Sequence, residues 1–101
     1  MYGLIGKITA VNGGRDELVQ ILLEGTADMP GCRSYVVATG ASNEQIIWVT
    51  EVWTDANSHQ ASLQLPGVQA AIMRGRPLIA AMERVAETAP AGGHGLGEPT
   101  G

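Results

Sequence analysis

The feature of this sequence that most restricts its fold is a run at residues 45–53 that is apolar on both of its alternating sides. The run reads Gln-Ile-Ile-Trp-Val-Thr-Glu-Val-Trp, and its β-branched and aromatic residues predict a strand. One face would carry Ile46, Trp48, Thr50 and Val52, and the other Ile47, Val49, Glu51 and Trp53. A strand with one face in water would alternate between apolar and polar residues. We therefore expect both faces to be covered.

The segments around this run alternate between strand-like and helix-like patterns. Runs of β-branched and apolar residues predict strands at residues 4–11, 32–39 and 83–88. Apolar positions spaced three and four apart predict a helix over residues 15–29, with Leu18, Val19, Leu22, Leu23 and Thr26 on its apolar side. Asp55 is a favourable N-cap for a helix over residues 55–64. Pro66 begins a further helical segment, residues 66–73, which is completed by a turn at 78–81.

This order of elements, β-α-β-β-α-β, predicts a ferredoxin-like α+β fold with a four-stranded antiparallel sheet. Right-handed crossovers place both helical regions on one face of that sheet. The opposite face needs another cover, and the sheet of a second copy of the chain would supply it. We therefore expect a homodimer in which Ile46, Trp48 and Val52 lie between the subunits.

The length and the C-terminal composition predict one domain followed by a tail. The chain has 101 residues, which suits a single domain over residues 1–88. Residues 89–101 contain five glycines and two prolines, so we expect this tail to form no regular element, His94 included. A domain of this size buries only about 60% of the surface of its unfolded chain. Dimerisation would bury more.

The charge and cysteine content exclude several classes of function. The net charge is −4 and the six Lys and Arg residues are scattered, whereas a nucleic-acid surface needs clustered cations. The single cysteine, Cys32, can form no intrachain disulfide, and no pattern of ligand residues indicates a metal. No run is long and apolar enough to span a membrane, and no secretion signal is evident. We expect a cytoplasmic protein without nucleic-acid or membrane partners.

Short motifs at the ends of the second and third predicted strands resemble those of the antibiotic biosynthesis monooxygenase (ABM) family. They are Pro30-Gly31-Cys32 and Glu51-Val52-Trp53-Thr54-Asp55, followed by His59 and Ser62. The resemblance implies a dimeric α+β barrel with one pocket per subunit, between the helices and the sheet. It also implies a small aromatic substrate that reacts with dioxygen without metal, flavin or nicotinamide, so no cofactor is expected. The absence of a glycine-rich phosphate loop after a strand agrees with this.

Five residues are candidates for the pocket. His59, whose unperturbed pKa of about 6.5 suits a base, is the predicted catalytic residue. Trp53 and Glu51 share a strand face and are predicted to bind substrate, with Glu51 orienting His59. Tyr35 could donate a phenolic hydrogen bond, and Arg74, near the broken helix, could meet an anionic ligand. The alternatives are a structural histidine tied to Glu51, core packing for Trp53 and Tyr35, a cap or ion pair for Glu51, and a solvated charge for Arg74.

Three functions follow from this reading. The first is a cofactor-independent monooxygenase acting on a small quinol or phenolic compound. The second is a non-catalytic dimeric protein of the same fold that binds small molecules or serves in a stress response. The third is a haem-degrading relative, which the acidic balance disfavours because haem propionates need a cationic pocket. Val49 stands where the polyketide-tailoring members carry a polar residue, which argues against anthrone oxygenation.

Overall fold

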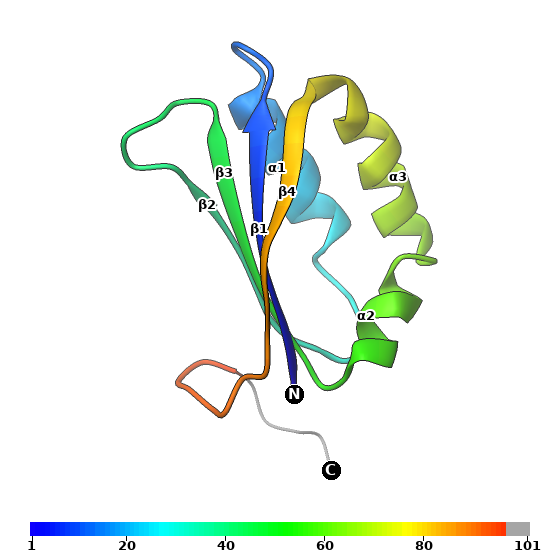
Figure 1. Ribbon diagram of the computed structural model, residues 1–101. Coiled ribbons are helices and arrows are strands. Elements are labelled where there is room, and N and C mark those ends of the chain that lie inside the picture. The colour runs from blue at the N-terminus through cyan, green and yellow to red at the C-terminus, as the bar shows by residue number, and fades with distance from the viewer. Residues whose placement is uncertain (97–101) are drawn as a thin grey trace.

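Residues 45–53 contain one of the two central strands of a four-stranded antiparallel sheet, as the computed structural model shows for residues 1–96 (Figure 1). The elements in chain order are β1 (Tyr2–Ala10), α1 (Arg15–Gly25), β2 (Cys32–Thr39), β3 (Ile46–Trp53), α2 (Ala56–Ser62), α3 (Pro66–Gly75), the 3-10 turn η1 (Arg76–Leu78) and β4 (Ile79–Thr88). The strand order is β2-β3-β1-β4. This arrangement confirms the predicted ferredoxin-like α+β fold.

The face of the sheet beneath the helices holds the core. Leu4, Gly6 and Ile8 of β1 lie opposite Glu51, Val49 and Ile47 of β3. Ile8, Ile47 and Val49 pack with Leu18 of α1 in one buried cluster, and Trp53 packs with Met29 and Val68 in a second. The exposed fractions of Ile47 and Trp53 are 0% and 1%. The predicted period-two division of β3 therefore places Val49, Glu51 and Trp53 under the helical layer.

The buried side of helix α1 keeps Leu18, Val19, Leu22 and Thr26 of the predicted apolar stripe, but it includes Ile21 in place of Leu23. Its fully buried residues are Leu18 and Ile21, whereas Leu23 is 47% exposed. The reason is that α1 packs against α3 as well as against the sheet. A Cβ atom at Gly25 would overlap with Ala71 of α3, so only glycine permits this close approach of the two helices. The helix ends at Gly25 instead of continuing to residue 29.

The turn before β2 is hydrogen-bonded to Thr54, which lies between β3 and α2. Gly31 has φ +81°, and its carbonyl oxygen accepts hydrogen bonds from Thr54 N (2.9 Å) and Thr54 Oγ1 (3.2 Å). Asp55 is the N-cap of α2, as predicted, and its Oδ1 accepts from Ser58 N at 2.7 Å. This hydrogen bond lowers the pKa of the Asp55 carboxyl. The contacts together hold the short helix α2 at one end of the sheet.

Strand β4 begins earlier than the sequence pattern indicates. The predicted helical turn at residues 78–81 is wrong, because Ile79 pairs with Ala10 and Ala81 with Thr9 in the β1–β4 ladder. Hydrogen bonding to β1 decides the conformation of this segment, and the local sequence pattern carries no information about that pairing. β4 is an edge strand, and only Ile79 and Ala86 are partly shielded from solvent.

The sheet face away from the helices carries exposed apolar side chains. Trp48 is 37% exposed and Val36 is 52% exposed, while Ile46 is already buried within the single chain. The ammonium group of Lys7 lies 5.7 Å from the centroid of the Trp48 ring. Coverage of this face by a second subunit stays a prediction. Within residues 1–96, no helix has the length and apolar character needed to cross a bilayer.

The chain beyond β4 contains no helix or strand over residues 89–96. This segment passes close to β1 and β2. A Cβ atom at Gly3 would lie 3.0 Å from Pro90, and Arg33 Nε donates to the carbonyl oxygen of Leu96 at 3.4 Å. Residues 97–101 of the predicted tail lie outside the described residues.

Candidate functional site

A cavity of about 530 Å³ lies between the sheet and the helical layer. Most of the side chains that line it are apolar, and they come from all four strands and all three α-helices. The polar or charged residues among them are Thr26, Tyr35, Glu51, His59, Ser62 and Arg76. A mostly apolar pocket with a few converging polar groups is the usual form of a small-molecule site.

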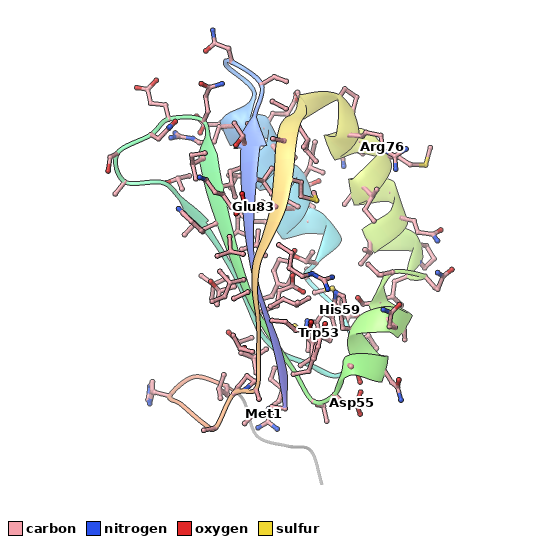
Figure 2. All side chains as sticks on the ribbon, viewed as in Figure 1. Met1, Trp53, Asp55, His59, Arg76 and Glu83 are labelled. Carbon is pink, nitrogen blue, oxygen red and sulfur yellow. The ribbon has the colours of Figure 1, made fainter. Side chains whose placement is uncertain are left out.

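His59 lies on α2 and its side chain lines one end of this cavity. The residue is only 8% exposed. Its ring meets the Trp53 ring edge-on, with centroids 5.5 Å apart, and lies 5.7 Å from the ring of Tyr2. Figure 2 shows His59 beside Trp53, where α2 approaches the sheet. The two aromatic neighbours restrict the orientation of the imidazole, which is what a positioned base requires.

Glu51 contacts both Trp53 and His59 at this end of the cavity. Its Oε1 accepts a hydrogen bond from Trp53 Nε1 at 3.0 Å and lies 4.0 Å from His59 Nε2. The side chain of Glu51 is 15% exposed and that of His59 is 11% exposed, so water screens this pair only partly. The structure thus places a carboxylate beside the imidazole at this end of the cavity.

Tyr35 lies on β2 directly opposite Glu51 in the β2–β3 register. It also lines the cavity. Burial raises the pKa of the Tyr35 phenol, and the nearby charge of Glu51 raises it further. The phenol therefore keeps its proton at neutral pH and is available as a hydrogen-bond donor to a ligand.

The two arginines near the end of α3 have different surroundings. Arg74, the predicted ligand-binding residue, makes an ion pair with Glu24 of α1 at 3.4 Å on the exposed outer surface. It does not line the cavity, whereas Arg76 does. Arg76 directly follows α3 and continues its helical backbone, so its side chain differs in direction from that of Arg74 by about 200° and only Arg76 faces the cavity. Of the five predicted site residues, the structure brings together Tyr35, Glu51, Trp53 and His59.

Several further residues shape this end of the cavity. Met29 and Val68 pack against Trp53, and Tyr2 packs against His59. Met29 precedes the Pro30-Gly31 turn, and Val68 lies in the first turn of α3. The only sequence signal for them is their apolar character, which does not distinguish a cavity wall from a core. Among residues 1–96, no group of three His, Cys, Asp or Glu side chains is arranged to hold a metal ion.

The fold and the cavity define a ferredoxin-like α+β protein with an apolar pocket beneath its helical layer. The sequence profile of the antibiotic biosynthesis monooxygenase family matches residues 1–74. The chain belongs to this family, which confirms the resemblance seen in its motifs. A comparison with curated proteins found no match.

Solved structures of proteins that carry the family's name are similar to this chain. One from Chloroflexus aurantiacus is 59% identical, with a TM-score of 0.91, over 95% of this chain and 98% of the other. One from Deinococcus radiodurans is 24% identical, with a TM-score of 0.77, over 92% and 95%. One from Nitrosomonas europaea is 10% identical, with a TM-score of 0.82, over 90% and 99%. The last two support the fold alone.

Proposed function

We propose that this protein is a cytoplasmic, cofactor-independent monooxygenase that oxidises a small quinol or phenolic compound in the cavity, with His59 as the base. The observation that carries the proposal is the grouping of His59, Glu51 and Trp53 at one end of an otherwise apolar cavity. Membership of the antibiotic biosynthesis monooxygenase family supports it.

The proposed reaction needs only the substrate and dioxygen. His59 removes a phenolic proton from a hydroquinone, and the electron-rich anion transfers one electron to dioxygen. The semiquinone and superoxide combine at a ring carbon to give a peroxide anion, and His59 returns its proton to form the hydroperoxide. The O–O bond then breaks, the ring C–H proton leaves with the hydroxide as water, and the resulting carbonyl compound tautomerises to a hydroxyquinone. One quinol and one dioxygen thus give one hydroxyquinone and one water, and the quinol supplies all the electrons.

Each residue at this end of the cavity has a part in the proposed reaction. Glu51, fixed by the Trp53 indole N–H, stabilises the imidazolium that forms when His59 takes up the proton. The protonated phenol of Tyr35 donates a hydrogen bond to the substrate's oxyanion. The apolar wall that includes Trp53 keeps water away from the radical pair and the hydroperoxide.

We also propose that the protein is a homodimer joined through the open face of the sheet. Trp48 and Val36 are large apolar side chains that remain exposed on this face in the single chain. A stable interface buries roughly 1,200–2,000 Å² in total, and a sheet face is a suitable surface for it.

Oxygen consumption tests the proposed reaction. A panel of benzo- and naphthohydroquinones is offered to the protein in an oxygen electrode, and the products are identified by mass spectrometry. His59→Gln keeps most of the side-chain volume, so it should leave folding intact and lower kcat by about 10²- to 10⁴-fold. The chain's other histidine, His94, is exposed and does not line the cavity, so His94→Gln serves as the matched control. Full turnover in His59→Gln would remove His59 as the base.

The non-catalytic alternative predicts a different result in the same experiment. The parent protein would bind aromatic compounds and consume no oxygen above the background rate of quinol autoxidation. In that case His59 would be a structural residue, and His59→Gln would lower the melting temperature without any effect on a rate.

A further inference from the structure

The cavity carries one charge of each sign, and the two charges lie at opposite ends. Glu51 and Arg76 are the only carboxylate and the only guanidinium among the described residues that line it. Figure 2 shows Arg76 near the C-terminal end of α3, with His59 and Trp53 toward the other end of the helical layer. The cavity is therefore polarised along its length.

The strand register indicates how far apart these two ends are. Glu51 lies opposite Leu4 of β1, while Ile79, three residues after Arg76, lies opposite Ala10. Six residues of an antiparallel strand span about 20 Å. Helix α3, which runs along the cavity between the two ends, has ten residues and is about 15 Å long. An Arg side chain shortens the gap by several ångströms, so the space suits a ligand longer than one aromatic ring.

Arg76 has no ion-pair or hydrogen-bond partner for its guanidinium within residues 1–96. Arg74, two residues earlier and within α3, is paired with Glu24. A guanidinium at the edge of an apolar cavity is a strong site for a planar anion, because it can donate two parallel hydrogen bonds to a carboxylate. The Glu51 end repels such an anion, so a ligand with a carboxylate at one end would bind in a single direction.

We propose that the cavity selects an elongated aromatic acid that has its phenolic ring against His59 and its carboxylate against Arg76. This inference rests on the proposed function, since it assigns the phenolic end to the reacting site. It makes Arg76 a residue that determines which substrate binds. A neutral quinol of one ring would fill only the His59 end and would bind less tightly.

Equilibrium binding tests the inference without requiring turnover. The probes are a biphenyl with a phenol hydroxyl at one para end and a carboxylate at the other, and the same compound with a carboxamide in place of the carboxylate. Isothermal titration calorimetry in low salt compares the two probes on the parent protein, Arg76→Gln, Arg76→Lys and the matched control Arg74→Gln. Arg74 and Arg76 are both exposed, so the variants should fold, and thermal melting of each variant checks this.

The parent protein should bind the acid about fivefold more tightly than the amide, because the ion pair between the ligand carboxylate and Arg76 is partly solvated and adds only modest free energy. In Arg76→Gln the affinities for the acid and the amide should agree within about twofold. Arg74→Gln should keep the parent's preference for the acid, and Arg76→Lys should keep part of it. The preference should shrink as salt is added. Equal affinity of the parent for both probes, no binding of either, or a preference that survives in Arg76→Gln would overturn the inference.

The binding result and the turnover result are separable. If the acid binds in an Arg76-dependent way and no quinol is oxygenated, the proposed reaction is wrong while the anion-binding end of the cavity stands. If quinols are oxygenated by a His59-dependent route and the acid shows no preference, the reaction stands and this inference is wrong.

Discussion

Replacing Gly31 by alanine should disturb α2 by two separable effects. Gly31 has φ +81°, a conformation that costs a residue with a Cβ atom about 1–2 kcal/mol. Its Cβ would also overlap with the side chain of Ser58 on α2, and relieving such a clash typically costs about 1–3 kcal/mol. Because His59 follows Ser58 directly, the shift that relieves the clash also moves the imidazole.

Gly13 is a matched control, because its φ is +80° and nothing lies within 4 Å of a Cβ built on it. Gly13→Ala therefore measures the backbone cost alone, about 1–2 kcal/mol. Gly31→Ala should cost about 1–3 kcal/mol more than Gly13→Ala. For a domain of this size each kcal/mol lowers the melting temperature by about 4–8 °C.

Urea unfolding and thermal melting followed by circular dichroism give both free energies of unfolding. On the proposed function, Gly31→Ala should also lose quinol turnover at temperatures where it is folded, and Gly13→Ala should not. Equal losses of stability in the two variants would refute the idea that the 30–32 turn holds α2 in place. Unchanged turnover in Gly31→Ala would show that the position of His59 does not depend on this contact.

Three further predictions concern Trp53, Asp55 and Trp48. Trp53→Phe removes the indole N–H that donates a hydrogen bond to Glu51, so urea unfolding should show a free energy of unfolding lower by about 1–3 kcal/mol. The hydrogen-bonded Asp55 carboxylate has a lowered pKa, so it stabilises the fold above the unfolded-state pKa, and this stability is lost as pH falls through the folded-state pKa. Melting temperatures measured from pH 6 down to pH 2 should therefore fall more steeply for the parent than for Asp55→Asn. Trp48→Asp on the open sheet face should convert the proposed dimer to a monomer in sedimentation experiments, and an unchanged dimer would place the interface elsewhere.

Local chemistry in the sequence was enough to predict the order of elements and the fold. The strand predicted at residues 32–39 coincides with β2, and the predicted Asp55 cap begins α2. The period of two along β3 was enough to put Trp53 and Glu51 on one face and Trp48 on the other, because that alternation is a property of the strand itself. The roles of the candidate site residues stay predictions.

The tertiary structure alone decided which residues meet across the cavity. Tyr35 faces Glu51 because β2 pairs with β3 in one register, and residues 79–81 are extended because β4 pairs with β1. Spacing predicts that Arg74 and Arg76 point in different directions, but not which of them faces inward. That choice depends on the rotation of α3, which is set by its close contact with α1 at Gly25. Pairing and helix rotation arise from contacts between residues far apart in the chain, so no local pattern records them.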